Sequence, residues 1–224
     1  MISENLLEVR QEIQNSCALV SRNPEEVNLV VVTKSVGTQE MTALYQLGER
    51  NFAENRVDVL LEKQEALKAF PGIQWHFIGH LQRRKVKKVI HTIDYFHALE
   101  SLKLAEEIQK RATKVLSCFV EVNVSGEESK QGVSPAELLS FIQALQPFDK
   151  IKVVGLMTMA PFEADEVEQL AIFNQLRSLQ EMINDLAYDY APCTDLSMGM
   201  SNDFSAAIQA GATYVRVGSA LFKE

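Results

Sequence analysis

Lys34 directly follows an apolar run that ends in threonine, and its amine is a group that could form a covalent bond. The run, residues 29–33, is rich in valine, which is typical of a strand buried on both faces of a parallel sheet. Parallel α/β folds place their chemistry at the carboxyl ends of such strands. Partial burial there would favour the neutral amine, which is a nucleophile and forms Schiff bases. The simpler alternative is that the side chain leaves the strand and reaches water.

Two turns near the C-terminus combine glycine with hydroxyl side chains. One follows an expected strand at residues 193–198 and contains Ser201, and the other follows an expected strand at residues 213–217 and contains Gly218 and Ser219. Glycine lets a backbone approach an anion closely, and free N–H groups at a helix start donate to it. In eight-stranded barrels the loops after strands seven and eight are a recurrent phosphate site. Ordinary helix capping by Ser201 and a tight turn at Gly218 are the structural alternative.

A lysine on one side of a barrel mouth and a phosphate cradle on the other predict a ligand with both an aldehyde and a phosphate. Pyridoxal 5′-phosphate (PLP) has both, since its aldehyde condenses with a lysine and protein groups hold its phosphate and pyridine nitrogen. Arg216 precedes the second turn and could meet either the ring nitrogen or the phosphate. A guanidinium stays protonated, so it would donate to the nitrogen and weaken the ring as an electron sink.

Strand and helix patterns alternate along the 224 residues of the chain. Strands are expected at residues 28–34, 51–54, 74–79, 93–98, 116–124, 151–158, 193–198 and 213–217. Segments with a 3.6-residue apolar period separate them, residues 3–21 form a helix before the first strand, and Ser134 with Pro135 predicts a helix start. We therefore expect one domain, residues 1–224, folded as an α/β (β/α)8 TIM-type barrel. The extra N-terminal helix would cover the gap beside the last strand. A doubly wound open sheet, with an unpaired edge strand, is the alternative.

Charge and composition exclude several classes of function. The net charge of −8 argues against a general affinity for nucleic acid or an anionic membrane. No apolar stretch reaches the roughly 18 residues that cross a bilayer, and the N-terminus has no signal-peptide pattern. The three cysteines, Cys17, Cys118 and Cys193, have no metal-binding spacing and predict reduced thiols. These observations predict a soluble, cytoplasmic protein.

Two further groups of residues have structural explanations. Residues 83–88 are a dense basic run with an apolar face, which predicts an amphipathic helix with a basic solvent side. A contact surface for an acidic partner is the alternative for this run. His76 and His80 are four residues apart in an expected strand, which separates them by about 13 Å. That distance is too long for one ion, so no metal site is expected.

Six short segments lie in order over nearly the whole chain: VTK at 32–34, NFAEN at 51–55, WHFIGHLQ at 75–82, GLMTM at 155–159, SMGMS at 197–201 and VRVGS at 215–219. Together they resemble the YggS/PROSC family, the pyridoxal-phosphate homeostasis proteins. The resemblance implies a barrel of the alanine racemase N-terminal-domain kind. Two segments depart from the family pattern. Ala53 stands where a glycine often precedes Glu-Asn, and residues 35–37 replace a turn that usually contains lysine and proline.

The resemblance also implies a role for each matched residue. Lys34 would form the Schiff base, Arg216 would lie near the pyridine nitrogen, and the two glycine- and serine-containing turns would hold the phosphate. The implied cofactor-binding residues are Lys34, Asn55, His80, Met157, Ser197, Met200, Ser201, Arg216, Gly218 and Ser219.

The family is described as carriers or regulators of vitamin B6 and amino-acid pools without an established catalytic activity. Racemisation needs bases on both faces of the substrate carbon. In racemases with this barrel, the second base is a tyrosine from another domain of the partner subunit, and no counterpart of that domain is expected here. We therefore expect a monomeric PLP carrier, with PLP-dependent acceptor enzymes as the partners this role would allow. The alternatives are a racemase-like PLP enzyme and, third, a Schiff-base sugar-phosphate aldolase or isomerase with Glu54 as its acid/base.

Overall fold

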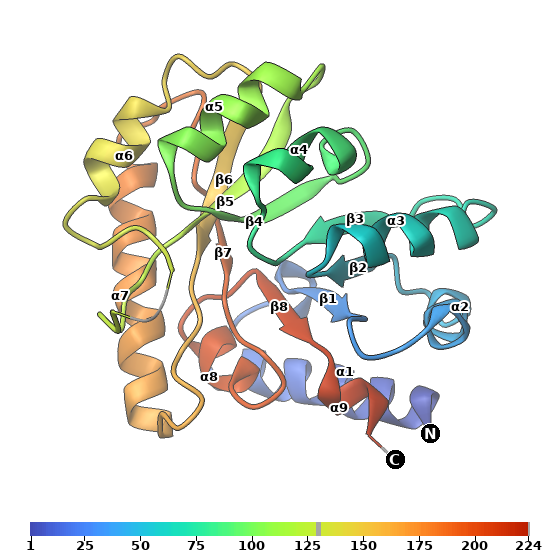
Figure 1. Cartoon of the computed structure of the whole chain (residues 1–224). Helices are drawn as coiled ribbons and strands as arrows, with labels where there is room; N and C mark the ends of the chain where they lie inside the picture. Colours follow the sequence, from blue (N-terminus) through green and yellow to red (C-terminus); the bar gives the residue numbers. More distant parts are fainter. Residues whose placement is uncertain (129–130, 224) are drawn as a thin grey trace.

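Eight parallel strands close into a barrel in the computed structural model, which describes residues 1–128 and 131–223 (Figure 1). The strands are β1 (Asn28–Val32), β2 (Asn51–Glu54), β3 (Gln74–Phe77), β4 (Tyr95–Leu99), β5 (Leu116–Glu121), β6 (Ile151–Met157), β7 (Asp195–Ser197) and β8 (Tyr214–Val217). Each lies within the segment predicted for it or overlaps it. β1 pairs with β2 on one side and with β8 on the other, from Asn28 opposite Tyr214 to Val31 opposite Val217. This closure confirms the barrel and excludes the open sheet.

Helices lie outside the strands, as a (β/α)8 barrel requires. They are α1 (Ile2–Leu19), α2 (Thr38–Gln46), α3 (Val57–Ala66), α4 (Arg83–Val89), α5 (Leu102–Arg111), α6 (Leu138–Ala144), α7 (Glu166–Asn184), α8 (Phe204–Gln209) and α9 (Ser219–Phe222), with a short 3-10 turn at Pro24–Glu26. The basic run forms the predicted amphipathic helix, α4, with Val86 and Val89 buried and Lys87 and Lys88 exposed. None of the described helices is both long and apolar enough to cross a membrane.

The predicted helix start at Ser134 is wrong. Ser134 Oγ accepts the backbone N–H of Glu137 and donates to its carboxylate, which closes a turn, and α6 begins only at Leu138. The sequence pattern of a capping serine three residues before a glutamate serves an isolated turn as well as a helix start.

The extra N-terminal helix covers the end of the barrel sequence, where α8 and α9 are short. Asn5 Nδ2 donates to the carbonyl oxygens of Leu221 and Lys223, at 3.0 and 2.9 Å. Arg22 donates to the carbonyl oxygens of Ile208 and Ala212, at 2.7 and 2.9 Å. Figure 1 shows α1 lying along α8 and α9, near both chain termini. The sequence prediction that this helix fills the gap beside the last strand is confirmed.

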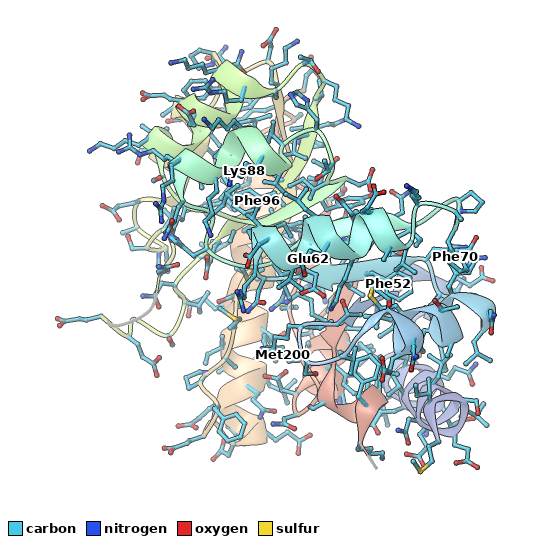
Figure 2. All side chains as sticks on the ribbon, turned by 45° about the vertical axis from the view of Figure 1, so that its right-hand side comes forward. Phe52, Glu62, Phe70, Lys88, Phe96 and Met200 are labelled. Carbon is cyan, nitrogen blue, oxygen red and sulfur yellow. The ribbon has the colours of Figure 1, made fainter. Side chains whose placement is uncertain are left out.

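Strand side chains alternate between two buried layers. Phe52 and Phe96 are fully buried and belong to the core shared by the strands and the surrounding helices (Figure 2). The neighbouring positions His76 and His97 point the other way, into the barrel, where their rings contact Tyr214 of β8. Both layers are therefore closely packed, and the groups that can meet a ligand lie toward the strand ends.

Candidate functional site

A cavity of about 630 Å³ lies at the carboxyl ends of the strands. Its wall contains nine of the ten residues predicted from the sequence as cofactor-binding: Lys34, Asn55, His80, Met157, Met200, Ser201, Arg216, Gly218 and Ser219. These residues come from segments that are far apart in the chain, because strand ends of a parallel barrel meet at one mouth. The tenth, Ser197, is fully buried and lies behind the wall.

Lys34 follows β1 in a turn, and its side chain is exposed while it lines the cavity. The partial burial considered for this side chain is therefore not found, and Lys34 reaches solvent, as in the simpler alternative, while it stands at the mouth. The preceding residue, Thr33, is fully buried, and its hydroxyl donates to Glu54 Oε1 at 2.5 Å. Within the described ranges, no ion pair holds the Lys34 amine. The end of β1 is thus fixed, and the amine beyond it can reach an aldehyde in the cavity.

Glu54 is fully buried and takes part in an ion pair rather than in the cavity wall. Its Oε1 accepts a hydrogen bond from Lys63 Nζ of α3, which also donates to the Thr33 carbonyl oxygen at 2.7 Å. A carboxylate held in this way is out of reach of a ligand. The sugar-phosphate alternative required Glu54 as acid/base, and the geometry removes that candidate.

The two glycine- and serine-containing turns meet through Ser201. Its Oγ accepts the backbone N–H groups of Gly218 and Ala220, each at 3.2 Å. The Gly199 carbonyl accepts the Arg216 N–H at 2.9 Å and so ties the first turn to β8. A Cβ on Gly218 would lie 3.0 Å from the carbonyl oxygen of Val32, so glycine lets β8 end close against β1. Hydroxyl and N–H groups therefore gather at one edge of the cavity, a donor set of the kind that binds anions.

Met200, labelled in Figure 2, belongs to the first of these turns and lines the cavity, as Asp203 does. Its backbone N–H donates to Asp203 Oδ1 at 2.6 Å. Burial raises the pKa of Asp203, and the hydrogen bond from Met200 opposes that effect. Sequence reasoning gave Asp203 no role, although it lines the cavity.

Arg216 is a nearly buried cation in the cavity wall. It donates to Ser197 Oγ from Nη1 and to the Thr158 carbonyl oxygen from Nη2, at 3.2 Å. Burial lowers the pKa of Arg216 from 12.5 to about 10, and the Asp203 and Glu121 carboxyl groups oppose the shift. The guanidinium therefore stays charged at neutral pH, as the sequence interpretation requires of a donor to a ring nitrogen.

Glu121 is a further wall residue that sequence reasoning missed. It ends β5, and it lines both the main cavity and a neighbouring one of about 210 Å³. Burial raises the pKa of Glu121 from 4.5 to about 7; Glu100 raises it further, and Arg216 and His80 oppose them. A charged residue closing an apolar strand is the same signal that identified Lys34, so the sequence did carry the information.

Replacing Glu121 by glutamine should stabilise the cofactor-free protein at high pH only. The pKa of the Glu121 carboxyl group is higher in the folded protein than in the unfolded chain. Below about pH 4.5 the group is protonated in both states, and Glu121 then makes its full contribution to stability. That contribution is lost as pH rises toward 7, by up to about 3 kcal/mol. In urea unfolding between pH 4.5 and 8, the free energy of unfolding of the variant should rise relative to that of the parent as the pH increases. Glu106→Gln, at an exposed position, is the control; a gain at Glu121 that does not change with pH would contradict the shift.

The alanine racemase N-terminal domain family matches residues 5–224 of the chain. The chain is 39% identical over 224 residues to the pyridoxal phosphate homeostasis protein of Aquifex aeolicus, covering 99% of this chain and 97% of the relative. It is 32% identical over 226 residues to the protein of that description from Escherichia coli K12, covering 99% and 95%.

Solved structures have the same arrangement of strands and helices. PipY of Synechococcus elongatus, solved without PLP, has a TM-score of 0.89 at 32% identity and covers 99% of this chain and 100% of its own. The same protein with PLP bound has a TM-score of 0.86 at 30% identity, with the same coverage. An alanine racemase of Clostridium difficile has a TM-score of 0.77 at 15% identity, and only 56% of its chain is covered. That last likeness is one of fold alone.

Proposed function

Because the chain belongs to the family of pyridoxal phosphate homeostasis proteins, built on the alanine racemase N-terminal domain, we propose that it binds PLP at the barrel mouth. In this role it acts as a carrier or regulator in vitamin B6 and amino-acid homeostasis. The observation that carries the proposal is that Lys34 and the Ser201 cradle line one cavity. PLP supplies an aldehyde, which condenses with a primary amine to form a Schiff base and water.

Each wall residue has a role in this proposal. Lys34 provides the amine, and Arg216 donates to the pyridine nitrogen. Ser201, Gly218 and Ser219 hold the phosphate, with Met200 alongside. The other residues that line the pocket are Asn55, His80 and Met157.

The positions of the tyrosines favour a carrier over a racemase. None of the five tyrosines belongs to the described cavity wall. Tyr45 donates to the Pro71 carbonyl oxygen, and Tyr188 stacks on Tyr190 with ring centroids 5.2 Å apart. Tyr95 and Tyr214 contact each other inside the barrel. The described wall thus holds no tyrosine, the base that racemases with this barrel use opposite the lysine, and this favours reversible loading of the cofactor over racemisation.

We place this function in the cytoplasm, in a monomer formed by residues 1–224 as one domain, with PLP-dependent enzymes as the receiving partners. Cys17, Cys118 and Cys193 are free and buried, which suits a reducing compartment. A sedimentation mass of two chains would contradict the monomer, and a secreted pool on cell fractionation would contradict the location.

Lys34→Ala is expected to abolish the covalent attachment of the cofactor. Added PLP should shift its absorption to longer wavelength with the parent protein and with Lys68→Ala, an exposed control, but not with Lys34→Ala. The same shift in Lys34→Ala would move the attachment to another amine. No shift in the parent protein would overturn the cofactor assignment.

A further inference from the structure

Five polar side chains form one hydrogen-bonded row across the barrel interior, from the cavity wall toward the opposite end. Arg216 of β8 donates to Ser197 Oγ of β7. Ser197 Oγ lies 2.7 Å from His97 Nδ1 of β4, and His97 Nε2 lies 2.8 Å from His76 Nδ1 of β3. His76 Nε2 lies 3.0 Å from Asn51 Oδ1, at the start of β2. Arg216 is the member that reaches the cavity.

The far end of the row sets the direction of its bonds, because Asn51 Oδ1 can only accept and His76 Nε2 must therefore carry a proton. At the cavity end a guanidinium can only donate, so Ser197 Oγ accepts from Arg216 and can donate its own hydrogen to His97 Nδ1. His97 then carries its proton on Nε2 and donates to His76 Nδ1. His76 in turn carries its proton on Nε2 and donates to Asn51 Oδ1. One arrangement of protons satisfies all four contacts, and it points away from the cavity.

The surroundings keep both imidazoles neutral. His76 and His97 have no exposed surface, and each ring stacks on an aromatic neighbour, Tyr95 at 4.6 Å and Phe119 at 4.5 Å between centroids. Burial lowers the pKa of His76 to about 3, and burial together with His76 and Arg216 lowers the pKa of His97 well below its usual range. Each ring therefore has a single proton, and the direction fixed at Asn51 Oδ1 is kept along the row.

The Arg216 guanidinium has two nearby carboxyl groups that could draw it away from Ser197 Oγ, so an acceptor held in place matters for its orientation. Asp203 and Glu121 both act on its charge and both line the cavity. A guanidinium turned toward either carboxyl group would point its remaining N–H groups away from a bound ring. The acceptors that oppose this turn are the Thr158 carbonyl oxygen and Ser197 Oγ. Ser197 is held as an acceptor because its hydrogen is already given to His97.

We infer that His97 and His76 are positioning residues for Arg216, and that the row of neutral side chains holds the guanidinium toward the pyridine nitrogen of PLP. The inference rests on the proposed function, which places the cofactor ring beside Arg216. Neither histidine lines the cavity. Their effect on the cofactor therefore passes through Ser197 and Arg216.

The protonation pattern can be tested on the parent protein without any cofactor. The chain has four histidines, so long-range nitrogen–proton NMR spectra can be assigned with single variants. His76 and His97 should both be neutral, with the proton on Nε2, throughout pH 6–9. The exposed His91 provides a reference resonance. A proton on Nδ1 of either ring, or a charged ring in this range, would overturn the inference even if PLP binds as proposed.

Variants test the effect on the cofactor. His97→Phe keeps the ring volume and removes both contacts, so PLP should bind roughly tenfold more weakly, with a displaced absorption maximum and attachment still on Lys34. His97→Gln retains a donor and an acceptor and should recover most of the affinity. His91→Phe, at an exposed position, is the control and should bind like the parent. A folded His97→Phe with parental affinity and spectrum would overturn the positioning role. If the parent itself does not bind PLP, the proposed function fails, and the role of the histidines toward the cofactor fails with it. The NMR spectra would still show whether the hydrogen-bonded row has the proton arrangement described above.

Discussion

Lys63→Met is expected to lower the free energy of unfolding by about 3–5 kcal/mol. Lys63 Nζ bonds to both Glu54 Oε1 and the Thr33 carbonyl oxygen, and its side chain is only 9% exposed. Glu54 Oε2 has no hydrogen-bond partner in the described part of the chain. Removal of the ammonium group would leave a buried carboxylate with one hydroxyl partner, which is among the most costly changes a core can suffer.

A second substitution shows how much of the stability loss comes from the broken Lys63–Glu54 ion pair and how much from lost packing of the lysine side chain. Glu54→Gln combined with Lys63→Met removes the uncompensated charge and should recover most of the stability, because a buried ion pair adds little over neutral groups. Lys68→Met breaks the ion pair with Glu65, in which both side chains are more than 70% exposed, and should change stability by less than about 1 kcal/mol. Urea unfolding measures all three. A loss for Lys63→Met as small as that for Lys68→Met would contradict the assignment.

Gly199→Ala is expected to lower the free energy of unfolding by roughly 2–6 kcal/mol and to weaken PLP binding. Gly199 has φ of +96°, which disfavours a residue with a Cβ. The added Cβ would also lie 2.6 Å from Ala207 Cβ and 2.9 Å from Phe204 Cα, so α8 would have to move. Because Ser201 lies two residues further along the same turn, the displacement reaches the phosphate cradle.

Gly48→Ala is the matched control for this prediction. Gly48 has φ of +103°, but no atom lies within 4 Å of an added Cβ there. It therefore measures the backbone cost alone, about 1–2 kcal/mol. Unfolding and PLP titration of the two variants should show a larger stability loss at Gly199 and an affinity loss at Gly199 only. Equal effects at both sites would show that packing against α8 is not the cause.

The residues at the mouth of the barrel could be predicted because each is marked by a short stretch of sequence around it. Each strand is an apolar run, and a charged or hydroxyl residue at the end of a run marks the mouth, as Lys34 and Ser201 do. Parallel strand ends then meet without further assumptions. The closure itself depends on pairing between residues 28–31 and 214–217, which are distant in the chain, and it followed only from the count of eight strands.

The features that could not be predicted depend on packing between distant elements. Glu54 looked like a candidate base because its partner, Lys63, approaches it only when α3 packs on the barrel. Ser197 was predicted as a pocket residue, but the structure places it behind Arg216, where it meets His97. His76 was recognised only as a residue unsuited to share a metal. The row that includes it requires four other strands to be in place.

Reduction of the PLP-loaded protein with borohydride, followed by mass analysis of its peptides, tests the central claim most directly. Borohydride converts a lysine Schiff base into a stable secondary amine, so the cofactor stays on the residue that held it. We expect the pyridoxyl mass on the peptide that contains Lys34 and no labelled peptide from Lys34→Ala. Label on another lysine, or no label on the loaded parent protein, would contradict the assignment of the barrel mouth as a PLP site built on Lys34.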